Sequence, residues 1–256
     1  MFRQLRIAAL LYLLLFVAAG AWIDRASTTD WDDTLYVNLY PLNGDDSDRV
    51  SDYLAGLDET SFSAIEDYLR TEAARYGRQH DRLAAITLGP PLTTSPPPPP
   101  RDGNALTVAA WSLRLRWWAW HATRNDRIPA ADIRLFVNYF PATDGVKLEP
   151  STGLQKGLVG IVNAFADPAL ESMNQVIIVH ELLHTLGATD KYDRTTLRPV
   201  APIGLGEPEK IPLYPQSRAE IMAGRLAVSP VDARIPQSLA ETVIGPLTAT
   251  EIGLLR

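Results

Sequence analysis

The stretch HELLHTLGATD, residues 180–190, determines how the rest of this chain is interpreted. Residues four positions apart on a helix lie on the same face, so His180 and His184 can bind one metal ion from one side. Glu181, one position after the first histidine, can reach a water molecule at the metal, where a general base is needed. The apolar run QVIIV just before the motif supplies a face that a helix can bury. The sequence therefore predicts a metal-binding helix over about residues 173–187.

The ligand set needs a third member, because a catalytic zinc ion usually takes three protein ligands and leaves the fourth position to water. The other two histidines, His80 and His121, lie far upstream and are expected to be ordinary surface or interfacial residues. A carboxylate is therefore expected to complete the site. Gly187 can adopt the left-handed conformation that ends a helix, which would turn Asp190 toward the metal. Asp193 is the nearest alternative within the same loop.

Residues 180–190 resemble the metzincin zinc-peptidase motif HExxHxxGxxH, with Asp190 in place of the last histidine. The variant with aspartate resembles the motif of snapalysin-like members. An Asp-x-Tyr sequence follows in those proteins, and Asp190-Lys191-Tyr192 resembles it. Metzincins also carry a methionine in a tight turn beneath the metal, and Met222 is the only methionine after the motif. The nearby Gly224 suits such a returning turn.

The resemblance covers residues 175–224 and implies an α+β, metzincin-like zincin domain in which a mixed, twisted sheet packs on the active-site helix. A single metallopeptidase-like domain would then occupy residues 30–256, with a smaller irregular C-terminal lobe at about residues 191–256. In metzincins the strand before the active helix is an edge strand that pairs with substrate. By resemblance, residues 157–165 would hold a peptide by main-chain hydrogen bonds.

A competing resemblance is to the thermolysin-like gluzincins, in which the third ligand is a glutamate from a later helix. The candidates for that role are Glu207, Glu209, Glu220 and Glu241. The first two lie in a Pro-rich segment that is not expected to be helical. Asp190 is therefore the preferred third ligand.

Together these residues predict a zinc-dependent endopeptidase that acts on a peptide or protein substrate. One zinc ion held by two histidines and Asp190 would polarise a water molecule, and Glu181 would take its proton and pass it to the leaving amine. A nearby tyrosine can stabilise the oxyanion as a hydrogen-bond donor. The preferred residue for this role is Tyr192, with Tyr214 and Arg225 as alternatives.

A second function class is a membrane-tethered, non-catalytic module whose zinc ion is structural or whose site has decayed. The intact Glu181 favours the enzyme, since a purely structural site does not need a carboxylate there. An intramembrane protease would need the motif inside a membrane span, and residues 176–186 are too short and too polar for one.

The 256-residue chain is long enough for one sizeable domain with its own core. Its formal net charge is -6 and its pI is near 5.3. The chain contains no basic cluster of the kind that nucleic-acid binding requires, so nucleic acid is not an expected partner. It has no cysteine, which excludes disulfides, a cysteine-ligated zinc ion, a thiol nucleophile and a cysteine-switch latency mechanism.

Residues 1–29 are expected to be a membrane anchor or an export signal. Arg3 and Arg6 precede an uncharged apolar run, residues 7–23, which is long for a signal-peptide core and short for a bilayer span. Trp22 suits an interfacial anchor, so an uncleaved single-pass anchor is preferred over a cleaved and secreted form. Either arrangement places the rest of the chain on the non-cytoplasmic side, and an uncleaved anchor would make the membrane a partner through this segment.

Hydrophobic periodicity and turn signals predict the remaining elements. Strands are expected at residues 34–40, 83–88, 133–140 and 158–165, the first of them ended by Pro41. Helices are expected at residues 61–76, 104–124 and 248–255, with Ser61 and Thr248 as caps. The Pro-rich loop at residues 90–101 is expected to be an extended spacer.

The predicted helix at residues 104–124 carries four tryptophans beside three arginines. An aromatic and basic helix of this kind can lie on a membrane surface. The preferred interpretation is that the aromatic stripe faces the core while the arginines face water.

Overall fold

The computed structural model describes residues 28–100, 104–142, 148, 151–154 and 158–255, together with residues 4, 6, 7, 11, 12 and 15. The expected anchor or signal, residues 1–29, therefore lies almost entirely outside the described residues. Within the described part of the chain, no helix combines the length and the apolar character that a bilayer span requires.

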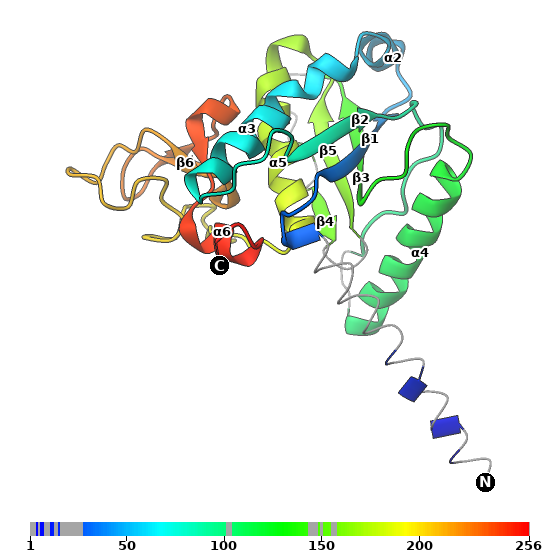
Figure 1. Cartoon of the computed structure of the whole chain (residues 1–256). Coiled ribbons are helices and arrows are strands. Elements are labelled where there is room, and N and C mark those ends of the chain that lie inside the picture. Colours follow the sequence, from blue (N-terminus) through cyan, green and yellow to red (C-terminus); the bar gives the residue numbers. More distant parts are fainter. Residues whose placement is uncertain are drawn as a thin grey trace.

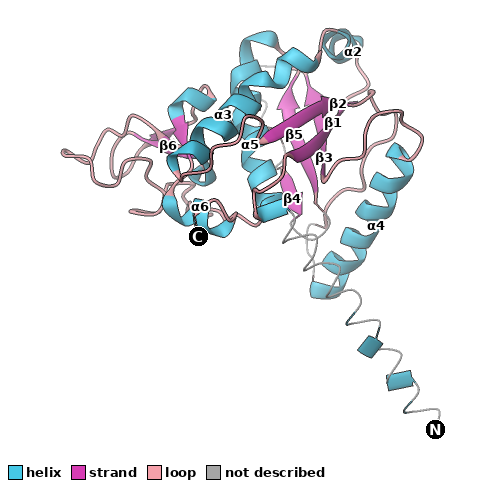
Figure 2. Cartoon of the chain, viewed as in Figure 1, coloured by secondary structure: helices cyan, strands magenta, loops and turns pink. Residues whose placement is uncertain are grey.

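A five-stranded sheet forms the centre of the molecule (Figures 1 and 2). Its strands are β1 (Leu35–Asn43), β2 (Ala84–Leu88), β3 (Ile133–Phe140), β4 (Thr152–Leu154) and β5 (Val159–Phe165). They lie in the order β2-β1-β3-β5-β4; β1, β2, β3 and β5 are parallel, and β4 pairs antiparallel with β5. The fold is a mixed α and β structure with a mostly parallel sheet, consistent with the α+β class expected from the sequence.

Helices cover both faces of the sheet, as Figure 2 shows. One face carries α2 (Asp48–Ala55), α3 (Ser63–Arg75) and α5 (Glu171–Leu186), and the other carries α4 (Ala105–Thr123). Successive side chains of a strand point to opposite faces. Alternate residues of β3 therefore enter two separate cores, the larger of which lies between the sheet and α5.

The first strand continues past its predicted end. Pro41 stands opposite Val137 of β3, whereas the pairing with β2 stops at Leu39. Pro41 has no partner in β2. On that side of β1 its carbonyl accepts a hydrogen bond from Leu92 N at 3.0 Å. A missing N–H is tolerated there, so proline does not end the strand.

Two helix starts differ from the predicted caps. A short 3₁₀ helix, η1 (Glu59–Phe62), precedes α3, and Asp58 caps it while Ser61 closes the capping box. The last helix, α6 (Pro246–Glu251), begins two residues before the predicted cap Thr248. Proline has a fixed φ that suits the first helical position, which explains this earlier start.

The edge strand beside α5 is β4, and the prediction that residues 157–165 form this edge is wrong. β5 lies between β3 and β4. In β4, Gly153 stands opposite Gly160. A Cβ atom on Gly153 would lie 2.5 Å from His184 Cβ and 2.6 Å from the Glu181 carbonyl oxygen. Glycine therefore allows the edge strand to run directly against α5.

The Pro-rich segment packs on the domain, because Trp111 Nε1 of α4 donates a hydrogen bond to the Pro97 carbonyl at 2.9 Å. Trp118 also faces inward, with its ring 4.7 Å from that of Phe136. The expectation that the tryptophan stripe faces the core is wrong for Trp117 and Trp120, which are exposed.

The chain after α5 contains only short elements. β6 (Ala219–Glu220) pairs with β9 (Thr242–Val243), and β7 (Leu226–Ala227) pairs with β8 (Ala233–Arg234). Two 3₁₀ helices, η3 (Ile221–Ala223) and η4 (Leu239–Glu241), and α6 complete this segment. Its buried residues join the larger core, so it packs against α3 and α5.

The start of α5 is attached to the sheet by one side chain. Asn174 is buried; its amide donates to the Phe165 carbonyl at 2.8 Å and accepts from Phe165 N at 3.0 Å. A 3₁₀ helix, η2 (Pro168–Leu170), connects β5 to α5. The clamp satisfies two backbone groups at the end of β5 and fixes the position of the helix that carries the histidines.

Replacing Asn174 with alanine should lower the free energy of unfolding by roughly 2 to 4 kcal/mol, because two backbone groups lose their partner. Urea unfolding followed by circular dichroism measures this change. The matched control is Ser172→Ala, an exposed position on the same helix, which should stay within about 0.5 kcal/mol of the wild type. Equal stability of the two variants would show that the clamp does not hold α5.

Candidate metal centre

The helix α5 ends where the sequence predicts. Gly187 is its C-cap with a φ of 108°, and its N–H donates to the His184 carbonyl at 3.1 Å. A left-handed backbone costs a residue with a side chain about 1 to 2 kcal/mol, so glycine suits this position. The loop that follows brings Asp190 back beside the imidazoles of His180 and His184.

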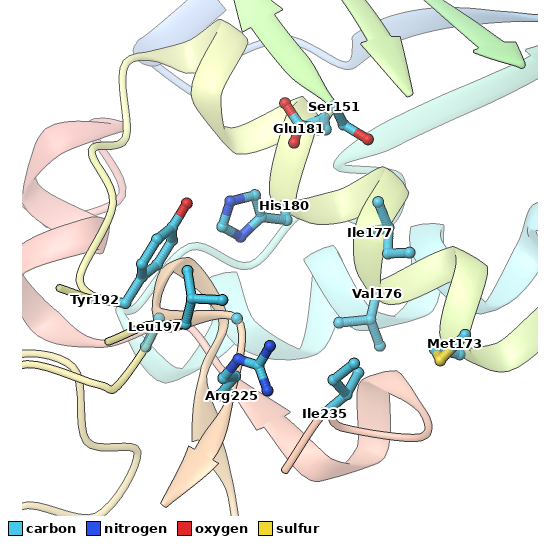
Figure 3. A pocket seen from close by; sticks show the side chains of 12 residues that line it. Ser151, Met173, Val176, Ile177, His180, Glu181, Tyr192, Leu197, Arg225 and Ile235 are labelled. Atoms are coloured by element: carbon cyan, nitrogen blue, oxygen red, sulfur yellow. The ribbon is translucent and has the colours of Figure 1, made fainter. Parts of the chain in front are cut away.

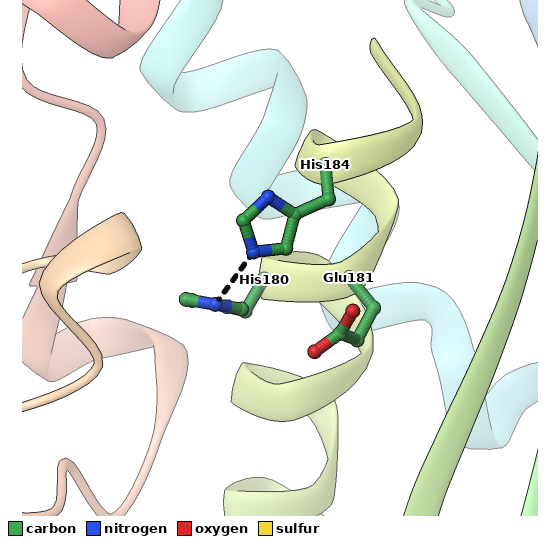
Figure 4. A group of neighbouring side chains, drawn as sticks. All are labelled: His180, Glu181 and His184. Carbon is green, nitrogen blue, oxygen red and sulfur yellow. Dashed lines mark hydrogen bonds between the residues drawn. The ribbon is translucent and has the colours of Figure 1, made fainter. Parts of the chain in front are cut away.

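Backbone carbonyls fix the tautomers of both imidazoles. His180 Nδ1 lies 2.9 Å from the Ile221 carbonyl oxygen, and His184 Nδ1 lies 2.8 Å from that of Ala188. Because a carbonyl oxygen can only accept, each Nδ1 carries the proton and each neutral ring keeps a lone pair on Nε2. The two Nε2 atoms lie 3.1 Å apart (Figure 4). Two lone pairs therefore face a common point.

Asp190 brings an oxygen to the same point. Its Oδ1 lies 3.5 Å from His180 Nε2 and 3.1 Å from His184 Nε2, and this buried atom has no hydrogen-bond donor among the described residues. Ligand atoms about 2.0 to 2.1 Å from a tetrahedral metal ion lie about 3.3 Å from one another. The three separations lie on either side of that value, so the three atoms fit one metal ion.

The charges around this point favour a cation. Burial alone would raise the pKa of the Asp190 carboxyl, but the two imidazoles hold that pKa well below its usual value. Burial alone would lower the pKa of His180, but Asp190 and the charge of Glu181 raise it. Both pKa shifts arise because carboxylates attract positive charge to this point. A metal ion supplies this charge while the rings stay neutral.

Glu181 is buried next to the two histidines. The ligand atoms of Glu181, His180 and His184 all lie within 4.8 Å of one another, and this group could hold a metal ion. Glu181 Oε2 is buried without a hydrogen-bond partner among the described residues. Burial raises the pKa of this carboxyl, although the backbone of Gly153 hydrogen-bonds to it. A desolvated carboxylate with a free lone pair is a stronger base than one in water.

The turn at Met222 connects the first histidine to the Asp190 loop. It is the 3₁₀ helix η3, which Gly224 ends with a φ of 64°. The Ile221 carbonyl accepts from His180, and the Met222 carbonyl accepts from Lys191 N at 2.9 Å. The Met222 side chain itself is fully buried in the larger core. The backbone of the turn thus supports the site, and the methionine secures the turn in the core.

Three residues that no motif marks hold the loop of Asp190 in place. Lys191 is buried, and its Nζ donates to Glu251 Oε2 at 2.7 Å and to the Thr189 carbonyl at 2.7 Å. Glu251 also accepts from Thr189 N at 2.9 Å. Burial would raise the pKa of Glu251, but these two partners lower it. A buried charge needs such pairing, and no local sequence signal reveals a partner 60 positions away.

The other ligand candidates are placed elsewhere. Asp193 is exposed, and its carboxylate accepts from the backbone N–H groups of the two following threonines. His80 and His121 are exposed, as expected. Among the alternative glutamates, Glu207, Glu220 and Glu241 accept hydrogen bonds from residues around them. Glu209 faces solvent.

A cavity of about 350 Å³ adjoins the centre (Figure 3). His180, Glu181 and Tyr192 line it, and the hydroxyl of Tyr192 points toward His180 in Figure 3. Burial raises the pKa of Tyr192, and Asp190 raises it further. Of the two alternatives to Tyr192, Arg225 lines the cavity and Tyr214 does not.

No protein-family model matches the chain, and no curated protein matches it. The metzincin resemblance therefore rests on the sequence motif within residues 175–224 alone. At the centre, the side chains of His180, Glu181 and His184 form a group that could hold a metal ion.

Zinc binding distinguishes the two aspartates of the loop. Asp190→Ala removes an atom that lies 3.1 Å from His184 Nε2, so the affinity for zinc, measured by competition with a chromogenic chelator, should fall at least about 100-fold. Asp193→Ala is the matched control, because the Asp193 carboxylate is exposed, and it should bind zinc like the wild type. Unchanged affinity in the Asp190 variant would exclude Asp190 as a ligand.

Proposed function

We propose that this protein is a zinc-dependent endopeptidase of metzincin-like type that hydrolyses peptide bonds in a peptide or protein substrate. One observation carries the proposal: His180 Nε2, His184 Nε2 and Asp190 Oδ1 lie within 3.5 Å of one another. The Glu181 carboxylate lies beside them, and a cavity adjoins the group. A purely structural metal site needs neither this carboxylate nor the cavity.

Zinc is the metal that the donor atoms favour. Two imidazole nitrogens and one carboxylate oxygen at tetrahedral spacing are typical of catalytic zinc sites. Calcium and magnesium prefer about six or more oxygen ligands, which this centre does not provide among the described residues. A bound zinc ion makes a water molecule more acidic and stabilises negative charge on an oxygen.

Glu181 acts as the general base of the proposed reaction. Its buried, unpaired Oε2 accepts the proton of the attacking water and later gives it to the leaving amine. Tyr192, whose hydroxyl points toward His180 (Figure 3), donates a hydrogen bond to the oxyanion that develops at the substrate carbonyl.

The substrate binds along β4 as an extended strand in this proposal. Among the described strands only β5 pairs with β4, so the other side of β4 has no strand partner, although the backbone of Gly153 already hydrogen-bonds to Glu181. Gly153 keeps β4 close to His184 and Glu181, and Ser151 lines the cavity. A peptide paired with β4 would therefore pass the metal centre.

The location of the enzyme is a further part of the proposal. The apolar run of residues 7–23 after Arg3 and Arg6 would anchor the domain at a membrane on the non-cytoplasmic side. Digestion of the domain by a protease added to intact cells tests this location, and complete protection in cells whose surface is accessible would contradict it.

Replacing Glu181 with alanine should lower hydrolysis of a broad peptide library at least about 1000-fold. One equivalent of zinc should stay bound, because the three proposed ligands remain, whereas His184→Ala should lose both zinc and hydrolysis. Tyr192→Phe should lower kcat about 10- to 100-fold with zinc retained. Metal analysis and mass spectrometry of the cleaved library give the two readouts.

Substantial hydrolysis by the Glu181 variant would exclude Glu181 as the base. Loss of zinc from the same variant would instead make Glu181 a ligand. A wild-type protein that binds one zinc ion and cleaves no peptide, once latency has been excluded, would favour the membrane-tethered, non-catalytic module.

A further inference from the structure

The cavity beside the metal centre has mostly apolar walls. Its apolar lining includes Met173, Val176, Ile177, Leu197 and Ile235. One cationic side chain also lines it: the guanidinium of Arg225 points toward Val176 and Ile235 in Figure 3. An apolar pocket with a single cation favours a ligand group that combines an apolar stem with a negative charge.

Arg225 differs from the other cations near the centre. It is half-buried, and no residue in the described part of the chain forms an ion pair or hydrogen bond with its guanidinium. Its neighbours are paired: Arg194 with Asp190 at 3.2 Å, Lys191 with Glu251 at 2.7 Å and Arg234 with Glu241 at 2.8 Å. The planar guanidinium offers donors in a fork that matches a carboxylate.

We propose that this cavity is a carboxylate-binding subsite, in which Arg225 pairs with an acidic group of the substrate residue that enters it. The inference rests on the proposed peptidase function. The apolar walls accommodate the methylene groups of a glutamate while the guanidinium binds its carboxylate. A lysine in this position would be repelled, and a neutral side chain would leave Arg225 without its partner.

Cleavage of blocked peptide pools that differ at one position, fixed as Glu, Gln, Leu or Lys, tests the subsite. At one position next to the scissile bond, the wild type should prefer Glu to Gln by about tenfold in kcat/KM. Arg225→Gln should lose this preference, so that it cleaves the Glu and Gln pools with equal kcat/KM. Arg218→Gln, which changes an exposed arginine of the same lobe, is the matched control and should keep the preference.

Peptides with a free or an amidated C-terminus separate the two sources of a carboxylate. A preference for the free C-terminus that Arg225→Gln abolishes assigns the subsite to the terminal carboxylate. Cleavage without any acidic preference, or the same preference in Arg225→Gln, overturns the subsite and leaves the peptidase intact. A zinc-loaded wild type that cleaves no pool overturns the peptidase function and the subsite with it.

The outer face of α4 carries a second, independent inference. Besides Val108, four large apolar side chains of this helix face solvent, namely Leu106, Leu113, Trp117 and Trp120, with exposed fractions of 80%, 65%, 64% and 52%. Their spacing places them on one side of the helix, opposite the residues that pack on the sheet. Figure 1 shows α4 at the periphery of the fold.

The charge of α4 is opposite to that of the chain. The chain has a net charge of -6, yet α4 contains no aspartate or glutamate. Helical periodicity places Arg114 and Arg116 on the two sides of the apolar stripe, and Arg124 at its end lies 5.4 Å from the centre of the Trp120 ring. Arginine stems can stay on an apolar surface while their charges reach polar groups beyond it.

We infer that this face of α4 lies on an anionic membrane surface. Tryptophan favours the boundary between headgroups and acyl chains, and the flanking arginines complement anionic headgroups. A second copy of the chain on the same face would bring two sets of arginines together, which opposes self-association. The apolar run of residues 7–23, acting as an anchor, would keep α4 near the bilayer.

A single introduced cysteine tests this inference cleanly, because the chain has none of its own. The full-length protein with Trp117→Cys, labelled with an environment-sensitive fluorophore, is reconstituted into vesicles of phosphatidylcholine with phosphatidylserine. Its emission should shift to the blue and be quenched by nitroxide lipids, and phosphatidylcholine alone or high salt should weaken both effects. The same label at Ile211→Cys, an exposed position of the C-terminal lobe, should not respond.

The absence of a response at position 117 on anionic vesicles overturns the inference. A blue shift in detergent that grows with protein concentration and needs no vesicles would show that a second copy covers the face, and it overturns the inference as well.

Discussion

Two backbone carbonyls, those of Ile221 and Ala188, determine the chemistry of the centre, because each accepts the Nδ1 proton of one histidine. In the other tautomer each ring would direct an N–H toward Asp190, and the three side chains would form a hydrogen-bonded cluster without a place for a metal ion. Both carbonyls belong to turns that contain a glycine with positive φ, Gly187 and Gly224. Backbone geometry therefore sets the electronic state of the side chains.

Buried ionisable groups secure these turns. Glu220 accepts from Ala223 N within the methionine turn at 3.0 Å and from Thr248 Oγ1 at 2.7 Å. Lys191 and Glu251 form the corresponding link for the loop of Asp190. Buried charges destabilise a fold unless they are paired, and pairing with fixed partners allows few alternative conformations. The ligands are thus held by a polar network whose own position depends on the last helix.

The sequence allows prediction of the features that a regular spacing determines. His180, Glu181 and His184 could be placed because one helix carries all three, and Gly187 because a left-handed C-cap favours glycine. β4 could not be predicted, since three residues cannot show alternation and the strand exists only through its pairing with β5. In the same way, nothing near Lys191 in sequence indicates that it is buried.

Sequence patterns also do not predict which tryptophans of α4 point outward. The helix is apolar on nearly all sides, so periodicity does not indicate which face packs on the sheet. The choice follows from shape: Trp111 and Trp118 fit against Pro97 and Phe136, which leaves Trp117 and Trp120 outside.

The pair formed by Lys191 and Glu251 also bears on the order in which the molecule is completed. Until α6 has formed, Lys191 has no countercharge at this position, and the loop that carries Asp190 lacks its support. A chain still emerging from the ribosome therefore lacks a finished centre until residue 251 has joined the fold. The metal centre would thus be complete only after most of the chain has folded.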